Sequence, residues 1–477
     1  MSRIPRRHVL AASLLALSAG PLALPATGSA ATTVSIKGAG FGHGVGMSQW
    51  GAKGLADHGS SAVDILTHYY TGTQVSSLAS SPDVRVLLAS RTSVTFSGAT
   101  LIGSRALVAS QSYSARVQGA SVVLSSSSGD DLVRFDGPVA IAAGGAPVTV
   151  AGSTAAGVTN GAYRGAIELR PSAGKLLVIN QLGLEDYVRG VVASESPASW
   201  PAAALQAQAV AARTYAITTD AGGDVFSQWS DTRSQVYRGV AGETATTDAA
   251  VRATDSRVVT YGGTPVTTFF FSTSGGRTEN NESSFLGAAP SPWLRSVDDP
   301  YDAESPRHTW SKVLTTAQMK AKLGSLVKGS YRSIRVTQRG ASPRIVSAQV
   351  IGSAGQTTVS GPTLRAKLGL DDTWASFRTV RTTVSRTRRA PAAVRAASLR
   401  AAADAGPSAF GATISGRIDP ASAGRRVTVQ RRSLLGSWKA VAITTTRAGG
   451  TYETLLPGPG TYRIAYRGTH GPAVDAA

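Results

Sequence analysis

Glu195 is the residue whose type and surroundings best suit chemistry. Apolar residues precede it at 191–193, and Pro197 and Trp200 follow it. Partly apolar surroundings raise the pKa of a carboxyl, because they disfavour its charged form. A raised pKa suits a general acid that works near neutral pH. The alternative is structural, with Glu195 capping the following helix or forming an ion pair with Arg213.

The stretch 183–217 must position this carboxyl. Its pattern predicts a short amphipathic helix, an apolar segment, a turn that carries Glu195, and a long alanine-rich helix with Ser199 as its N-cap. One face of the long helix carries, at helical spacing, Leu205, Ala209, Ala212 and Ala216. Because the remaining residues are also mostly small and apolar, we expect this helix to be buried nearly all round.

This stretch resembles the signature of the SpoIID/LytB family, an E-P-like turn followed by an A-L-x-A-Q-A-V-A-A-R-T-Y-A helix. The matching residues are Glu195, Pro197 and 204–216, and one departure is Ser196, where the family commonly has Met. The family's sporulation member is a lytic transglycosylase that cleaves peptidoglycan glycan strands. The resemblance therefore implies that Glu195 is catalytic and that this chain acts on glycan strands. The family's other role, a non-catalytic wall-binding enhancer of a peptidoglycan amidase, is the alternative.

A glycine-dense segment at 33–73 contains G-A-G-F-G-H-G-V-G-M-S-Q-W-G-A and I-L-T-H-Y-Y-T-G-T, which resemble two further family motifs. In family members these motifs follow the catalytic segment, whereas here they come first. A rearranged piece preserves a fold only if it still packs in the same place, so we expect 33–73 to contact the Glu195 region. His43 and Gln49 would then bind substrate. On physical grounds alone the glycines could form a phosphate cradle, but the spacing of a P-loop is missing.

Two later polar segments also resemble family motifs. In 224–239, Ser230 and Ser234 stand where relatives place cysteines. Serine is a poor zinc ligand, so neither a metal nor a cofactor is predicted. The turn at 272–279 suits the binding of sugar hydroxyls, or could satisfy its own hydrogen bonds as a Ser/Thr turn. The resemblance adds as substrate-binding residues Arg213, Tyr215, Asp231, Gln235, Tyr237, Ser272, Ser274, Gly275, Gly276, Thr278 and Glu279.

The reaction class depends on a second carboxylate. A transglycosylase can use one carboxyl as acid and then base, whereas a hydrolase normally needs two at a defined separation. The carboxylates available as the second group are Asp231, Glu279, Asp298 and Asp299.

The N-terminus predicts export. Arg3, Arg6 and Arg7 precede an apolar stretch at 9–24, and small residues suited to cleavage follow, so 1–31 is predicted as a signal peptide. No later stretch is apolar enough to span a bilayer. The chain has no cysteine and cannot use disulfides. We expect a secreted or wall-associated protein.

The predicted architecture is an α+β core with an all-β C-terminal domain. Recurrent short alternating runs predict many strands in the core, 32–380, made of the glycine-rich segment and a main part at 83–380. A basic Ala/Arg linker at 381–406 is expected to lead to an immunoglobulin-like sandwich at 407–477, with an accessory binding or spacer role.

The net charge is +20, and residues 381–477 hold 15 basic and 4 acidic side chains. Such a basic surface could meet nucleic acid, an anionic membrane or anionic wall polymers. An exported chain without a recognisable nucleic-acid motif favours wall polymers and not nucleic acid. Simple solubility, or the arginine-rich usage of a high-GC coding sequence, is the alternative.

Overall fold

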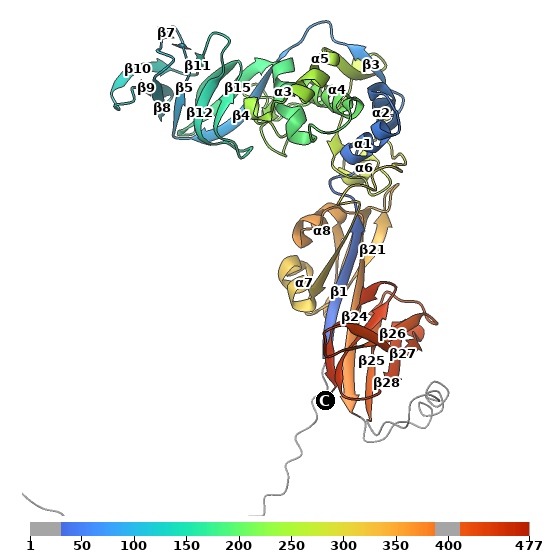
Figure 1. The fold of residues 1–477 in the computed structure, drawn as a ribbon. Coiled ribbons are helices and arrows are strands. Elements are labelled where there is room, and N and C mark those ends of the chain that lie inside the picture. Colours follow the sequence, from blue (N-terminus) through green and yellow to red (C-terminus); the bar gives the residue numbers. More distant parts are fainter. Residues whose placement is uncertain (1–29, 387–410, 477) are drawn as a thin grey trace, which may run out of the picture. The chain divides into compact units, whose positions relative to one another are not determined.

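The computed structural model describes residues 30–386 and 411–476. The described residues form two compact units: a larger unit, Val34–Arg378, and a smaller unit made of the described parts of Thr379–Ala477 with residues 30–33. Most of the predicted signal peptide, and residues 387–406 of the predicted linker, lie outside the described residues. The larger unit combines strands and helices, which confirms the predicted α+β class (Figure 1).

Two antiparallel sheets in the larger unit share one apolar core with helices α3 (Leu184–Glu195) and α4 (Ala202–Thr218). The first sheet has the order β16 (Gln228–Trp229), β4 (Asp83–Arg91), β15 (Lys175–Gly183), β14 (Ala166–Ser172), β11 (Val139–Ala142), β6 (Leu101–Ile102) and β7 (Arg105–Ala106), with only β16 parallel to its neighbour. The second has the order β10 (Asp131–Asp136), β9 (Ser121–Ser125), β8 (Ser112–Gln118), β5 (Ser93–Ser97), β12 (Val148–Ser153) and β13 (Thr159–Tyr163). Strand β15 leads directly into α3, so this sheet fixes the start of the helix that ends at Glu195.

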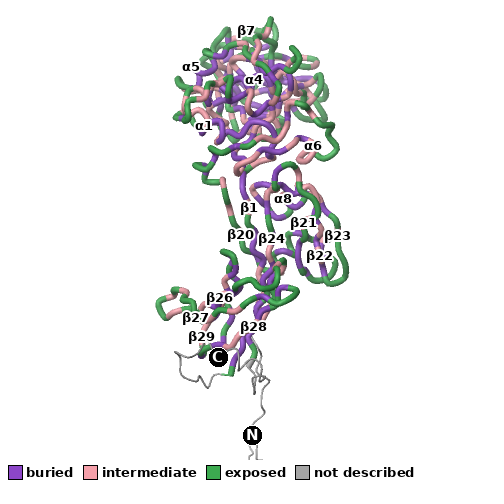
Figure 2. Tube along the Cα trace, turned by 90° about the vertical axis from the view of Figure 1, so that its right-hand side faces the viewer, coloured by how far each residue is buried: buried purple, intermediate pink, exposed green. Residues whose placement is uncertain are grey.

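Helix α3 is continuous and includes Glu195 as its last residue, so the prediction of a separate turn at this position was wrong. The Ser199 N-cap was also wrong, because α4 has Pro201 as its N-cap and no side-chain cap bond. Proline disfavours helical backbone in the residue before it, which delays the helix until after Pro201. The expected burial of α4 is confirmed, and Figure 2 shows its trace as largely buried.

The glycine-rich segment forms β1 (Ala30–Ala39), β2 (Met47–Ser48), α1 (Gln49–Asp57) and α2 (Ala62–Tyr69). Strand β2 pairs in parallel with β19 (Phe270–Phe271), and both α1 and α2 pack on α4. The expected contact between 33–73 and the Glu195 region is therefore confirmed. Helix α1 begins after Ser48, whose side chain accepts a hydrogen bond from the Gly51 N–H, as an N-cap does.

The glycines of this segment allow close packing within the protein. Gly44 and Gly46 have φ of 85° and 76°, in the left-handed region that favours glycine. A Cβ at Gly44 would overlap the Arg344 guanidinium, and one at Gly46 would overlap the Phe269 carbonyl oxygen. The space that a phosphate cradle would offer to a ligand is here filled by the protein's own atoms.

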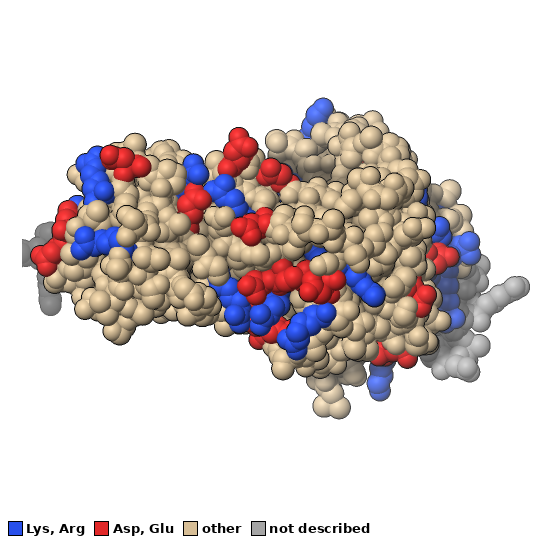
Figure 3. Space-filling view, turned by 90° about the horizontal axis from the view of Figure 1, so that it is seen from above, with Lys and Arg blue, Asp and Glu red and all other residues tan. Residues whose placement is uncertain are grey.

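The rest of the larger unit supports these elements. A second core joins three-stranded sheet β21 (Tyr331–Arg339), β22 (Ile345–Gly352), β23 (Gly355–Ser360) to α7 (Thr316–Leu323) and α8 (Gly361–Leu368). The remaining α-helices and strands are β3 (Gln74–Ser77), α5 (Ala245–Ala253), β17 (Arg257–Tyr261), β18 (Thr264–Pro265), α6 (Asn281–Ser284) and β20 (Thr309–Thr315). Among the described residues, no helix is both long and apolar enough to cross a membrane. On the face drawn in Figure 3, acidic and basic groups lie interspersed over a mostly uncharged surface.

Strands of two sheets surround the apolar core of the smaller unit. In one sheet, β25 (Ala412–Asp419) lies between β24 (Ala375–Arg386) and β28 (Thr451–Leu455). The other has the order β27 (Trp438–Thr445), β26 (Arg426–Arg432), β29 (Gly460–Tyr466) and β30 (Thr469–His470), and β31 (Val474–Ala476) also pairs with β29. Residues 381–386 belong to β24 and not to a linker, because they pair with β25. The immunoglobulin-like assignment stays a prediction.

Replacing Gly46 by alanine is expected to destabilise the larger unit more than the same change at Gly59. Both have positive φ, 76° and 89°, so each variant loses about 1 kcal/mol to left-handed strain. Only Gly46 faces protein atoms, which adds roughly 1–3 kcal/mol of overpacking, whereas nothing lies within 4 Å of a Cβ at Gly59. Urea denaturation measures both, and equal losses would contradict the packing role of the segment.

Candidate active site

The Glu195 carboxylate is held by two donors from distant parts of the chain. Its Oε1 accepts a hydrogen bond of 2.8 Å from the Val236 N–H, and its Oε2 accepts one of 3.2 Å from Gln49 Nε2. The Gln49 amide also donates to Gln208 Oε1, at 3.5 Å. The first residue of α1, a residue of α4 and the loop after β16 thus fix the carboxylate at the C-terminal end of α3.

Glu195 combines burial with partial access. The residue is half-buried, and burial raises the pKa of its carboxyl. The hydrogen bonds from Val236 and Gln49 and the charge of Arg238 lower the pKa and offset part of this rise. A partly accessible carboxyl with a raised pKa suits proton donation near neutral pH.

Aromatic residues accompany the carboxyl. Burial is the main cause of the raised pKa of Tyr215, and the negative charge of Glu195 adds to it. Trp50, next to Gln49, contacts Trp200 edge-on with ring centroids 5.2 Å apart. The backbone N–H of Trp50 donates to the Ser272 carbonyl. Gln49, Tyr215 and Ser272 are the predicted binding residues that the structure connects to the Glu195 region.

Sequence reasoning missed Trp50 and the Val236 N–H. The signal for Trp50 was its place beside Gln49 in the glycine-rich motif, since indole rings offer apolar faces with a polar N–H. A backbone N–H leaves no signal in the sequence, because every residue except proline carries one.

Three of the predicted binding residues are structural. Arg213 is fully buried, and both of its bonds to Glu185 are short, 2.7 and 2.6 Å, so the proposed pairing of Arg213 with Glu195 is wrong. Gln235 accepts from the Tyr187 hydroxyl at 2.8 Å, and the buried Tyr237 donates to Asn180 at 2.6 Å. Each of the three thus has a hydrogen-bond partner within the fold, as buried polar groups generally do.

Asp231 is held at the surface of its loop. Arg233 donates two hydrogen bonds of 2.8 Å to its carboxylate and lowers its pKa. The same guanidinium lies 3.6 Å from the centroid of the Trp229 ring. Asp231 is therefore held as a carboxylate and is poorly suited to donate a proton.

The polar turn at 274–279 satisfies its own hydrogen bonds, as the structural alternative required. Ser274 and the Gly275 N–H both donate to Asp302, and the Gly276 N–H donates to Ser274. The Thr278 hydroxyl accepts from the Val297 N–H.

Glu279 joins this turn to a distant loop. Its carboxylate is fully buried and accepts from the N–H groups of Asn280, Ala341 and Ser342 and from the Ser342 hydroxyl. Such a carboxylate supports the fold and has no free oxygen for a sugar, which corrects its assignment as a binding residue.

His43 lies within the glycine-rich loop. Its Nδ1 accepts from the Val45 N–H and its Nε2 contacts the Phe270 carbonyl, so both ring nitrogens are occupied. Burial lowers its pKa to about 3, and the nearby charges of Arg365 and Arg344 contribute. His43 is a neutral structural residue here and not a substrate-binding one.

No carboxylate in the part of the chain that the structure describes hydrogen-bonds to Glu195. Asp298 pairs with Arg277 at 2.9 Å. Asp299 is fully buried, and this burial raises the pKa of its carboxyl. The negative charge of Asp302 adds to the rise. The arrangement therefore provides one carboxyl with a raised pKa and partial access.

The region around Glu195 is similar in sequence to known proteins. Residues 172–261, which include Glu195, match the family model described as SpoIID, stage II sporulation protein. The chain is 36% identical over 211 residues to stage II sporulation protein D of Bacillus subtilis (strain 168), covering 40% of this chain and 60% of that protein. The region around Glu195 is therefore similar to SpoIID proteins. The chain is also 35% identical over 148 residues to the amidase enhancer of the same organism, covering 30% of this chain and 19% of that protein.

The SpoIID match is limited in extent. A second stage II sporulation protein D, from Bacillus amyloliquefaciens, is 32% identical over 209 residues and is covered to 59%. The chain thus spans about three fifths of the length of these two relatives. Gln49 lies outside the residues matched by the SpoIID family model, although it contacts Glu195 inside them.

Gln49→Met is expected to raise the pKa of Glu195. The variant keeps the side-chain length but removes a donor that stabilises the carboxylate, so the protonated form gains. NMR titration of the glutamate carboxyl carbons, assigned with Glu195→Gln, measures this pKa. Gln206→Met, on α4, is the control for the same chemical change and should leave the pKa of Glu195 unchanged. An unchanged or lowered pKa in Gln49→Met would contradict the geometry.

Folding stability should report the same carboxyl. Because burial raises the pKa of Glu195, the folded state binds this proton more tightly than the unfolded chain, so stability falls as pH rises above the ordinary value of 4.5. Glu195→Gln removes this loss. The free energy of unfolding of the variant, relative to wild type, should therefore increase between pH 4 and pH 7 in chemical denaturation. A constant difference would mean that the carboxyl is not desolvated.

Proposed function

We propose that this chain is a peptidoglycan lytic transglycosylase with Glu195 as its single acid and base. The observation that carries the proposal is a half-buried carboxyl with a raised pKa, held by two donors and without a carboxylate partner among the described residues. The similarity to SpoIID proteins supports glycan strands as the substrate.

The mechanism uses one proton-transfer group twice. Protonated Glu195 donates its proton to the oxygen of the bond between N-acetylmuramic acid and N-acetylglucosamine, and the bond from the anomeric carbon to that oxygen breaks. The Glu195 carboxylate then takes the proton of the muramic 6-hydroxyl as that oxygen bonds to the anomeric carbon. A 1,6-anhydro ring forms and no water is consumed, so a second carboxylate to activate water is unnecessary.

The neighbours of Glu195 fit this use. Gln49 and the Val236 N–H stabilise the carboxylate once it has given up its proton, and burial favours its return to the protonated form. These opposing effects suit a group that acts first as acid and then as base. Tyr215 and Trp50 supply aromatic surface for sugar rings.

A second candidate function is a non-catalytic enhancer of a peptidoglycan amidase. The similarity to the protein named amidase enhancer favours it, and an amidase would then be the partner. Under this function, Glu195 would be a half-buried structural carboxylate. In either case we infer that the protein is exported to the cell wall, which the basic and apolar N-terminal residues support.

Glu195→Gln should abolish cleavage and keep glycan binding. The change removes the transferable proton with little change of shape, and losing one acid/base group typically costs ~10²–10⁴ in rate. Purified glycan strands are incubated with each protein, and products are identified by mass. Glu304→Gln, at an exposed carboxylate paired with Lys53, is the matched control and should keep full turnover.

The products distinguish the candidate functions. Anhydro-muramic ends in the wild type support the transglycosylase, and reducing ends would indicate a hydrolase. Absence of products, together with faster cleavage by an added amidase, would favour the enhancer. Wild-type turnover by Glu195→Gln would contradict the role of Glu195.

A further inference from the structure

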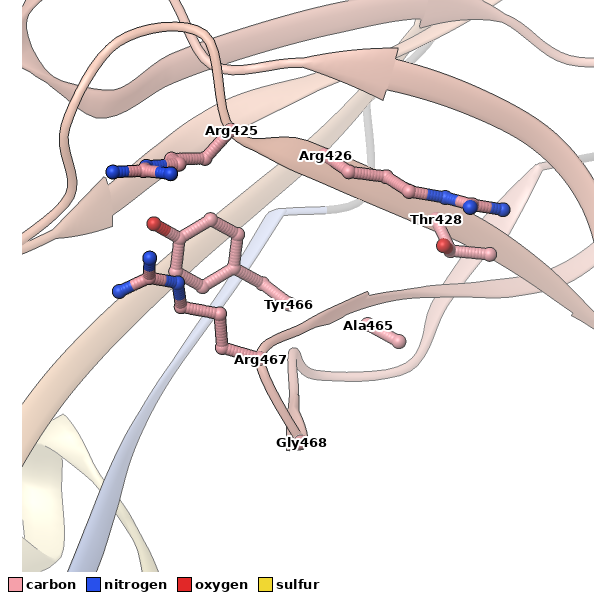
Figure 4. A pocket seen from close by; sticks show the side chains of 7 residues that line it. All are labelled: Arg425, Arg426, Thr428, Ala465, Tyr466, Arg467 and Gly468. Carbon is pink, nitrogen blue, oxygen red and sulfur yellow. The ribbon is translucent and has the colours of Figure 1, made fainter.

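A basic cavity lies in the smaller unit, which contains none of the residues assigned above. Its volume is about 380 Å³. The residues that line it and carry the argument are Arg425, Arg426, Thr428, Tyr466, Arg467 and Gly468 (Figure 4). Figure 4 shows Arg425 and Arg467 to one side of Tyr466 and Arg426 to the other, so cationic groups flank the cavity from two directions.

The cavity opens where two strands part. The last residue pair that joins β26 to β29 at this end is Thr428 with Ala465. Beyond this pair the two strands are no longer joined, and Arg425, Arg426 and Arg467 all line the cavity at this open end. Like charges gathered around one cavity repel one another, and an anion bound there would relieve the repulsion.

The described residues do not compensate the charge at this cavity. Residues 411–476 hold nine arginines and lysines against three acidic residues. Of these acids, Glu453 faces Arg447 at 3.7 Å and Asp475 accepts from Thr461. Across the described residues, none of the three cavity arginines forms an ion pair, and all three are exposed.

Arg467 occupies an unfavourable backbone position. It forms with Gly468 the two-residue turn between β29 and β30, where Tyr466 pairs with Thr469. The two turn residues have φ of 46° and 67°, as type I′ turns require. Asn, Asp and Gly are preferred at the first of these positions, because other side chains are strained there. An arginine at such a position favours a role for its charge.

We propose that this cavity binds the phosphodiester groups of an anionic polymer. Guanidinium groups bind phosphate oxygens through paired N–H donors, and the Thr428 hydroxyl offers one more donor. Cations on both sides of Tyr466 fit successive phosphates of a chain better than one isolated ion. This site works independently of Glu195, so its failure and the failure of the proposed activity are distinguishable.

The test measures binding of the full chain to poly(glycerol phosphate) by isothermal titration calorimetry. Arg426→Gln should weaken binding about tenfold, the loss of one charge-assisted contact. Arg432→Gln changes an exposed arginine of the same strand outside the cavity and should leave affinity unchanged. Arg467→Asn should also weaken binding about tenfold, and it gives the turn a preferred residue, so misfolding does not explain a loss.

Two further arms identify the ligand. Vesicles containing phosphatidylglycerol present the same phosphodiester on a lipid surface. The cavity binds whichever of the two ligands, poly(glycerol phosphate) or the vesicles, loses affinity in Arg467→Asn. Affinity should fall as salt rises, because exposed charges are screened over about 10 Å at 0.1 M. Equal losses in Arg426→Gln and Arg432→Gln would overturn the site. Equal binding of the carboxylate polymer polygalacturonate would overturn its phosphate chemistry.

Discussion

The hydrogen bond between Gln49 and Glu195 joins residues 146 positions apart, and the candidate active site depends on it. It can form only if α1 packs on α4, and that packing needs the glycine-rich loop to fold tightly against the segment around Phe269. The carboxyl thus has a raised pKa through burial and a stabilised anion through donors that come from another part of the chain. Neither effect exists in α3 alone.

Many of the polar residues that were predicted to bind substrate instead stabilise the fold around Glu195. Arg344 is fully buried against Asp372 and also donates to the Ser274 carbonyl, so it ties the polar turn to the glycine-rich loop. Glu279 holds the loop at 340–342 in the same way. Removing one partner of such a buried pair leaves an uncompensated charge, which is strongly destabilising. A motif of polar residues can therefore be specific to a family for structural reasons.

The smaller unit follows a different principle. Its strands follow the alternation of apolar and polar residues in the sequence. Apolar side chains from one face of each sheet form its core. The remaining faces carry an excess of arginine, and the cavity at the end of β26 gathers three of them. The two units thus place their candidate chemistry differently, one in a half-buried carboxyl and the other in exposed cations.

Several helices and strands follow from the residue pattern of their own segment. The strands near 426–431 and 460–466 follow from alternation, and α1 and α2 follow from their caps and apolar spacing. The motif around Glu195 also predicted the similarity to SpoIID proteins and pointed to the candidate acid. The start of α4 was missed because the restraint that Pro201 places on the preceding residue outweighed the capping preference of Ser199.

Tertiary structure alone decided which polar residues meet the carboxyl. His43, Arg213 and Glu279 have types suited to binding, yet each finds its partners within the fold. The backbone N–H of Val236 does contact Glu195, although its side chain gives no sign of it. The physical reason is that hydrogen bonding and desolvation depend on which atoms packing brings together, and a pattern along the chain does not contain those distances.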